Sequence, residues 1–313
     1  MYYYRRGLIK INDFYSKKLL PKLALFMAAF IWGSSFFIMK NTVDVFPPFI
    51  LLGFRFTIAS ILLSAVFWKR VKQVNKEYIW KGAIIGLFLF LGYGTQTIGI
   101  TETTPGKNAF LTAIYCVIVP FLFWAVDKSK PDKYNFMAAL VCISGIGLVS
   151  LKGDFTVGFG DAFTLLGGFL YAGHLVAVAK LGKGKDPIIL TILQFSFAAL
   201  FSWCIGLVYE DFPSTWGMGT MFGLLYLAVF ATAVALLFQN IGQKWTHPSA
   251  AAIILSLESV FGVLFSIVFY GEQLTLRLII GFIFIFVAVL VSETKLTFIR
   301  NFLKPKSSLD EKA

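Results

Sequence analysis

The chain has 313 residues, of which 58% are hydrophobic and only 14% are charged, and its mean hydropathy is +0.79. A soluble domain is ordinarily about half apolar and one quarter charged, so this composition excludes a chain folded around one water-soluble core. It indicates an integral membrane protein, in which the net charge of +12 must be explained by its placement along the chain.

Apolar runs of about 18 to 25 residues recur along the whole chain, and each can span ~30 Å of hydrocarbon as a helix. A basic arm (1–19) precedes these runs and a polar tail (294–313) follows them. The first run is too long for a signal-peptide core and no small-residue cleavage pattern follows it, so we expect it to stay in the mature chain. We therefore predict an all-α integral membrane protein with ten transmembrane helices, over about residues 20–40, 47–68, 80–100, 107–126, 133–151, 159–180, 187–208, 217–240, 248–270 and 274–293.

Lysine and arginine alternate from one predicted loop to the next. If the N-terminus is cytoplasmic, 23 of the 28 basic residues lie on the inner side and four on the outer side, and Arg55 lies within the second helix. The positive-inside rule then predicts a multi-pass protein of the cytoplasmic membrane with both termini in the cytoplasm. The basic balance is thus a topology signal that also attracts anionic lipid, and it does not indicate a nucleic-acid partner.

The ten helices divide into two sets of five, over residues 20–151 and 159–293, which must enter the membrane in opposite senses because five is odd. The segment "QTIGITETTPGKNAFLTAIYCV" (96–117) aligns with "QNIGQKWTHPSAAAIILSLESV" (239–260) at a constant offset of 143, with seven identities. Both segments contain a helix end, a short loop with proline and the start of the next helix. We predict two inverted five-helix repeats, an architecture of many secondary transporters, which bind substrate between their halves.

Three segments also resemble a known family. "FIWGSSFFIMK" (30–40), "PPFILLGFRFTIASILL" (47–63) and "SLESVFGVLFSIVFYGEQLT" (256–275) are similar to the first, second and ninth helices of the EamA family of the drug/metabolite transporter superfamily. The resemblance covers residues 20–293, and its most specific part is the Gly-Glu turn after the ninth helix. The first half departs from the family pattern, since "WAVDKSKPD" follows its fourth helix where a Gly-Glu pair often stands.

Members of that family export or exchange amino acids and other small metabolites, so the resemblance implies a secondary transporter working by alternating access. We expect an exporter of a small metabolite, such as an amino acid or a related amphiphile. The alternatives are a carrier of sugar nucleotides or lipid-linked sugars, a membrane scaffold without transport activity, and an intramembrane enzyme. The expected partners are a small-molecule substrate, membrane lipid and, as a candidate coupling ion, the proton, while the oligomeric state stays open.

Glu258 is the one carboxylate within the apolar run 250–270. An ionisable side chain near the middle of a bilayer costs at least ~2.5 kcal/mol, so it needs a partner, a wet cavity or a function. No lysine or arginine stands in its own helix to form an ion pair. Glu258 is a candidate for binding a substrate ammonium group or a coupling proton, and the alternative is a protonated residue that fixes the helix.

Arg55 and His174 are the other ionisable residues placed deep in predicted helices. Arg55 lies about 9 Å beyond Phe49 along its helix, and it could bind a substrate carboxylate, pair with an acidic side chain or tie helix ends to backbone carbonyls. His174 could carry protons near neutral pH, or could be a neutral imidazole bonded to a neighbouring serine or carbonyl.

Trp32 and Tyr171 occupy corresponding places in helices one and six, where an amphipathic ring can stack on a ligand and also form a hydrogen bond. Gln96 and Gln239 fall near the ends of helices three and eight and either face a cavity or bond across helices. With Arg55, His174 and Glu258, these residues form the predicted substrate cavity.

The sequence gives little support to an enzyme. "GFGD" (158–161) has the form used by intramembrane aspartyl proteases, but no transmembrane Tyr-Asp partner precedes it, and HExxH and GxSxG do not occur. Cys116, Cys142 and Cys204 have no paired spacing and are interpreted as small core residues. We predict no enzymatic activity, no cofactor and no metal site.

Overall fold

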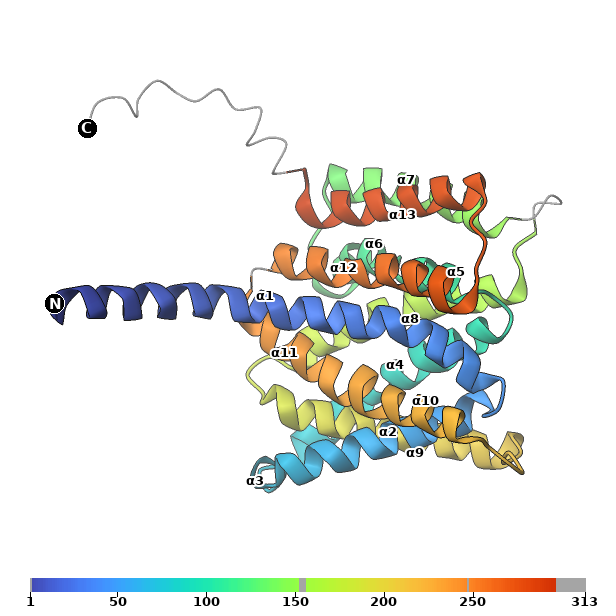
Figure 1. Cartoon of the computed structure of the whole chain (residues 1–313), viewed down its shortest axis with the longest axis horizontal. Coiled ribbons are helices and arrows are strands. Elements are labelled where there is room, and N and C mark those ends of the chain that lie inside the picture. The colour runs from blue at the N-terminus through green and yellow to red at the C-terminus, as the bar shows by residue number, and fades with distance from the viewer. Residues whose placement is uncertain (1, 152–155, 247, 297–313) are drawn as a thin grey trace.

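A computed structural model describes residues 2–151, 156–246 and 248–296 (Figure 1). Over these residues the chain is helical and contains no β-strand, which confirms the predicted all-α class. Nine helical segments in the described part are long and apolar enough to cross a membrane, and Ile254–Tyr270 is a shorter apolar helix. The ten predicted spans are thereby accounted for, while the polar tail lies outside the described residues beyond 296.

The first five predicted spans correspond to seven helical pieces. The first piece starts inside the predicted basic arm and is continuous with the first span. The fourth predicted helix is interrupted at Ala113 and Ile114, so that it consists of two helices in succession. The pieces are α1 (Tyr2–Val43), α2 (Pro48–Val66), α3 (Trp68–Val71), α4 (Lys76–Thr101), α5 (Pro105–Thr112), α6 (Tyr115–Asp127) and α7 (Lys133–Ser150).

The second five spans include two π-helical segments, which were not predicted. One widens the middle of the eighth span and the other ends the ninth at Gly271, whose φ of 74° lies in the left-handed region that glycine adopts without strain. The pieces are α8 (Phe159–Leu181), α9 (Pro187–Tyr209), α10 (Met218–Ala228), η1 (Val229–Val234), α11 (Ala235–Trp245), α12 (Pro248–Phe265), η2 (Ser266–Tyr270) and α13 (Leu276–Thr294).

Polar caps explain where several of these helices begin. The side chain of Asn75 accepts hydrogen bonds from two backbone N–H groups of the first turn of α4. Asp132 forms a reciprocal capping box with Asn135 at the start of α7. Such side chains satisfy backbone donors that have no partner within the helix, so the boundaries follow from local sequence.

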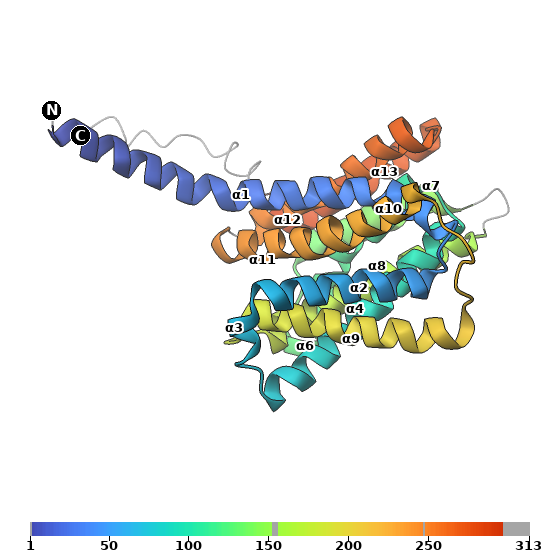
Figure 2. The ribbon, with the colours of Figure 1, turned by 60° about the horizontal axis from the view of Figure 1, so that its bottom comes forward.

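The helices pack as a bundle whose axes run in broadly similar directions (Figures 1 and 2). α4 lies against α8 and α9, α1 against α11 and α12, α2 against α9, and α7 against α13. Glycine allows the closest of these contacts, since a Cβ on Gly99 of α4 would meet the backbone of α8 at Gly160. Small residues at such contacts are typical of helix association in membranes, where backbones must approach closely.

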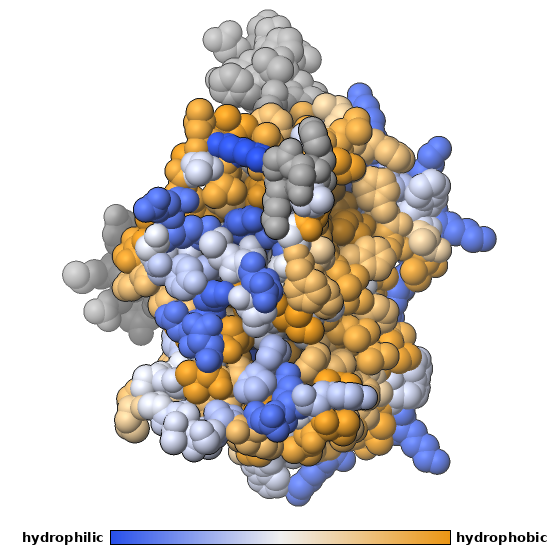
Figure 3. All heavy atoms as spheres, turned by 90° about the vertical axis from the view of Figure 1, so that its right-hand side faces the viewer, coloured by the Kyte–Doolittle hydropathy of each residue, from blue (hydrophilic) through white to orange (hydrophobic). Residues whose placement is uncertain are grey.

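Figure 3 shows the end of the bundle opposite the N-terminus. Polar side chains gather across part of this end, and apolar side chains surround them. This is the face that the predicted topology places outside the cell.

Candidate functional site

A cavity of about 180 Å³ lies among the helices of both halves. One water molecule needs only about 10–15 Å³ of such space, so the cavity has room for a small organic molecule. Its wall is mostly apolar with a few polar groups, as in many small-molecule sites. All seven predicted site residues line this cavity, namely Trp32, Arg55, Gln96, Tyr171, His174, Gln239 and Glu258.

Arg55 of α2 is 2% exposed and has no carboxylate partner among the described residues. Its Nε donates to Thr232 Oγ1 at 2.5 Å and its Nη2 to the Ala231 carbonyl at 3.4 Å. Its guanidinium lies over the ring of Tyr93, 4.6 Å from the centroid. Guanidinium has five N–H donors in a planar fork, so these contacts orient Arg55 and leave donors for a planar acceptor such as a carboxylate.

The π-helical segment η1 supplies both acceptors of Arg55. Thr232 Oγ1 donates to the carbonyl of Leu227, five residues earlier, at 2.8 Å, and can therefore accept from Arg55. The carbonyl of Ala231 also accepts from Trp32 Nε1 at 2.8 Å. A widened helical turn of this kind frees backbone groups for other partners, and such turns are frequent at functional sites. Through these bonds η1, which is part of the eighth span, contacts Trp32 of α1 and Arg55 of α2 beside the cavity.

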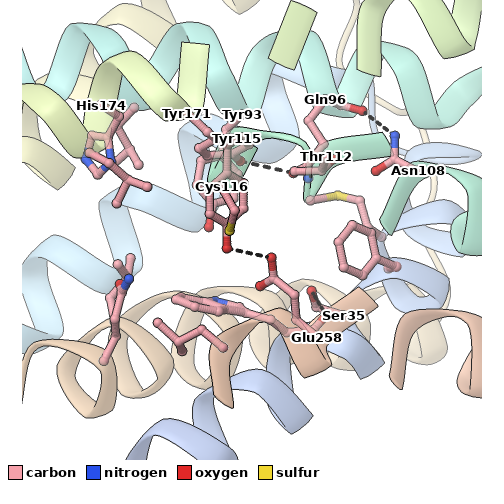
Figure 4. A pocket seen from close by; sticks show the side chains of 18 of the residues that line it. Ser35, Tyr93, Gln96, Asn108, Thr112, Tyr115, Cys116, Tyr171, His174 and Glu258 are labelled. Atoms are coloured by element: carbon pink, nitrogen blue, oxygen red, sulfur yellow. Dashed lines mark hydrogen bonds between the residues drawn. The ribbon is translucent and has the colours of Figure 1, made fainter. Parts of the chain in front are cut away.

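Glu258 of α12 is 6% exposed, and its Oε1 accepts a hydrogen bond from the hydroxyl of Tyr115 at 3.1 Å. Figure 4 shows the two side chains meeting across the cavity. Within the described ranges no lysine or arginine pairs with this carboxylate. The interruption between α5 and α6 at Ala113 and Ile114 places Tyr115 at the start of α6, facing α12.

Gln96 and Tyr171 form one wall of the cavity. The Tyr171 hydroxyl donates to Gln96 Oε1 at 3.0 Å, and Gln96 Nε2 donates to Thr112 Oγ1 at 2.9 Å. Tyr171 also packs edge-on against Tyr93, with ring centroids 5.2 Å apart. Hydrogen bonding between helices and lining of a cavity were considered as alternatives for Gln96, and the structure shows both together.

His174 of α8 is 7% exposed, and its Nε2 lies 2.8 Å from Gln194 Oε1, a distance at which the imidazole donates to the amide oxygen. The partner is thus a glutamine of α9 and not the serine or carbonyl considered from the sequence. In Figure 4 His174 stands at the end of the cavity away from Asn108.

Seven further polar residues of the wall were not identified from the sequence, namely Ser35, Tyr93, Thr97, Asn108, Thr112, Tyr115 and Glu293. One signal for Tyr115 was available, since it stands 143 residues before Glu258, which is the offset of the internal alignment. Glu293 is an acidic residue in the last turn of a span. The others are common residue types in α1, α4 and α5 and carry no local signature.

The cavity therefore combines one cation, Arg55, with two acidic residues, Glu258 and Glu293, and with aromatic rings. This set can bind a molecule that carries both an anionic and a cationic group on a small apolar framework. No group of three or more metal-ligating side chains occurs in the part of the chain that is described.

Several proteins with similar sequences are named as transporters. An uncharacterized transporter of Archaeoglobus fulgidus is 32% identical over 276 residues, which cover 88% of this chain and 86% of that protein. The uncharacterized transporter YvbV of Bacillus subtilis is 25% identical, over 89% of this chain and 94% of its own length. The uncharacterized inner membrane transporter YedA of Escherichia coli K12 is 24% identical, over 83% of this chain and 86% of its own length.

A protein of known crystal structure has the same fold. It superimposes with a TM-score of 0.64 at 16% sequence identity, over 91% of this chain and 99% of its own. The sequence also matches the EamA-like transporter family over residues 20–151 and 158–294, which is most of its length. The chain is a multi-pass membrane protein that belongs to the EamA-like transporter family.

Proposed function

We propose that this protein is a secondary transporter that exports a small zwitterionic metabolite, such as an amino acid, across the cytoplasmic membrane. The observation that carries the proposal is the pair of buried charged residues, Arg55 and Glu258, which line one cavity and are not ion-paired within the described residues. A substrate carboxylate would satisfy Arg55, and a substrate ammonium group would satisfy Glu258. The rings of Trp32 and Tyr171 would contact the apolar part of the substrate.

The packing supports the inverted repeat, an architecture with which many transporters achieve alternating access. The spans are numbered one to ten along the chain, and each is exchanged with the span five places before or after it. The contact of α4 (span three) with α8 (span six) then becomes the contact of α11 (span eight) with α1 (span one). In the same way the α4–α9 contact becomes the contact of α2 with the eighth span, and α1–α12 becomes the contact of α8 with α5 and α6. The pairs α2–α9, α7–α13 and α5–α12 map onto themselves. Tyr115 and Glu258, which the offset of 143 makes equivalent, are in contact, as expected near the axis relating two repeats.

A carrier of nucleotide sugars fits the cavity less well. A diphosphate carries at least two negative charges, whereas Arg55 is the one lysine or arginine among the described residues that line the cavity. Two acidic residues share the same wall and would repel it.

The test is export by purified protein in liposomes loaded with a panel of amino acids and other small metabolites, with and without a pH gradient. Export of at least one zwitterion, and its stimulation by a gradient if the proton is the coupling ion, is the expected result. Export of none of the zwitterions by protein that is folded and correctly inserted would contradict the proposal.

Orientation has its own test. Single cysteines in the loops 69–79 and 181–186 should react with a membrane-impermeant thiol reagent only from the cytoplasmic side, and those in 209–216 only from outside. The accessible native Cys204 must first be replaced. Labelling of the first two loops from outside would refute the predicted orientation, with both termini in the cytoplasm.

A further inference from the structure

Two buried oxygen atoms of cavity-lining side chains have no hydrogen-bond partner among the described residues. They are Asn108 Oδ1 and Thr97 Oγ1, of residues that are 0% and 1% exposed. Buried polar groups are nearly always hydrogen-bonded, and each exception needs an explanation. An explanation consistent with their position is that the missing partner arrives with a ligand.

The orientation of the Asn108 amide is fixed by its neighbours. Its Nδ2 donates to Thr164 Oγ1 at 2.8 Å and to the backbone carbonyl of Gln96 at 3.3 Å. Thr164 uses its own hydroxyl hydrogen on the carbonyl of Gly160 at 2.7 Å, so it can only accept from Asn108. The NH₂ group must therefore face these two acceptors, and the oxygen is the atom left without a partner.

Thr97 and Asn108 belong to neighbouring parts of the cavity wall, because Asn108 bonds to the backbone carbonyl of Gln96, the residue before Thr97. Thr97 lies one turn after Tyr93 on α4, and the guanidinium of Arg55 lies over the ring of Tyr93. In Figure 4 Asn108 stands beyond Gln96 and Thr112, on the opposite side from His174. The charged residues of the wall come from α2, α12 and α13, whereas Thr97 and Asn108 come from α4 and α5.

We propose that Thr97 and Asn108 form a second subsite, which binds a neutral hydrogen-bond donor of the substrate, such as a hydroxyl or carboxamide. The proposal rests on the function proposed above and narrows its substrate class to zwitterions with a polar, uncharged side chain. Asn108 Oδ1 can only accept, and Thr97 Oγ1 can accept or donate. An apolar side chain bound there leaves both oxygens unpaired, so the subsite discriminates against it.

Thr97→Val tests the subsite, because valine has the shape of threonine and the hydroxyl that it removes makes no hydrogen bond within the protein. Purified protein in nanodiscs is titrated with threonine and valine, and with glutamine and methionine, and thermal stabilisation reports binding. The unsubstituted protein is expected to prefer the polar member of at least one pair by about tenfold or more. In Thr97→Val the preference should fall to about threefold or less. The melting temperature without ligand should rise by about 2 °C, since an unpaired buried hydroxyl is gone.

Thr191→Val is the matched control. Thr191 Oγ1 donates to the Pro187 carbonyl and accepts from Asn240 Nδ2, both at 2.8 Å, and Thr191 does not line the cavity. This change should lower the melting temperature and leave the preference intact. Asn108→Ala should abolish the preference and also lower the melting temperature, because its Nδ2 bonds hold α5 against α8 and α4.

The outcomes separate the two proposals. Equal binding of polar and apolar partners by the unsubstituted protein, or a preference that survives Thr97→Val, would overturn the subsite and leave the Arg55 and Glu258 site standing. Binding of neither member of any pair would refute the amino-acid proposal and this subsite with it.

Discussion

Buried charges in the cavity and buried charges at the end of the bundle that the predicted topology places outside the cell, here called the predicted outer face, are satisfied differently. Asp161, in the first turn of α8, is bound by Lys107 Nζ at 2.5 Å and by Thr103 Oγ1 at 2.6 Å. Glu272 accepts from the backbone N–H of Gly106 at 2.9 Å and from the hydroxyls of two other residues. Glu258 has one neutral donor in the described structure, and Arg55 has two neutral acceptors.

The difference separates two roles of charge in a membrane protein. A buried ion leaves water at a cost of several kcal/mol, and a fully bonded one recovers most of that cost within the fold. Asp161 and Glu272 fit this structural role, since each joins the first half of the chain to the second at the predicted outer face. The hydrogen bonds of Arg55 and Glu258 within the protein offset a smaller part of their desolvation cost. We expect a bound ligand to offset the rest.

Arg55→Gln removes the one lysine or arginine among the described residues of the cavity wall and is expected to have the largest effect. Transport should fall about 100-fold or more, because loss of one partner of a desolvated charge pair costs about 2–5 kcal/mol. Export by reconstituted protein gives the measurement. Arg277→Gln is the control, since Arg277 is exposed and donates to backbone carbonyls at the predicted outer face. Equal export by Arg55→Gln and Arg277→Gln would show that Arg55 does not bind the substrate.

Asp161→Asn tests the structural side of the comparison. Breaking its buried pair with Lys107 should lower the free energy of unfolding by about 2–3 kcal/mol, because the lysine keeps its charge without a partner. Selectivity among substrates, measured per folded protein, should not change. Adding Lys107→Met should restore part of the stability. Native stability together with altered selectivity in Asp161→Asn would show instead that Asp161 takes part in substrate binding, as proposed for Arg55 and Glu258.

Glu258→Gln should preserve folding, because the amide has the shape of the neutral acid, and should lower transport about tenfold. It should also flatten the dependence of transport on pH between about 5 and 8, since the carboxyl no longer takes up or releases a proton. His174 and Glu293 are other titratable groups on the wall, so His174→Gln and Glu293→Gln are measured beside it. An unchanged pH profile in Glu258→Gln, with a flattened one in either of the others, would assign proton coupling elsewhere.

Trp32→Ala and Tyr171→Ala should each weaken substrate binding by about 1–3 kcal/mol while leaving the folded yield largely intact. Each change also removes one hydrogen bond, from Trp32 Nε1 to the Ala231 carbonyl or from the Tyr171 hydroxyl to Gln96 Oε1, so effects of similar size are expected. Phe230→Ala, at an aromatic position 48% exposed and outside the cavity, is the control. A parallel loss of yield and binding in the cavity variants would indicate packing alone.

Apolar periodicity predicted the spans because length and hydropathy are local properties of the chain. Capping signals at Asn75 and Asp132 are also local. The break before Tyr115 and the π-helical turn beside Thr232 could not be predicted, because hydrogen bonds and packing between distant helices decide them. The Gly-Glu turn was recognised only as a family resemblance, whereas the structure shows Glu272 capping the start of α5 from the other half of the chain.

The candidate site shows the same limit. An isolated charge in an apolar run is visible in the sequence, which is why Arg55, His174 and Glu258 could be singled out. Asn108 and Thr97 look ordinary in sequence, and only the hydrogen bonds around them show that one oxygen of each has no partner. Their proposed role depends on contacts between α4, α5 and α8, which no local pattern encodes.

The central claim is that Arg55 and Glu258 hold opposite ends of a zwitterion, and three matched ligands test it most directly. Binding of threonine, of 1-amino-2-propanol, which lacks the carboxylate, and of 3-hydroxybutanoate, which lacks the ammonium group, is measured with purified protein in nanodiscs. The account predicts that the unsubstituted protein binds the amino acid at least tenfold more tightly than either analogue. It also predicts that Arg55→Gln loses the preference over the amine and Glu258→Gln the preference over the acid. Equal affinities for all three ligands, or the same loss of both preferences in each variant, would contradict it.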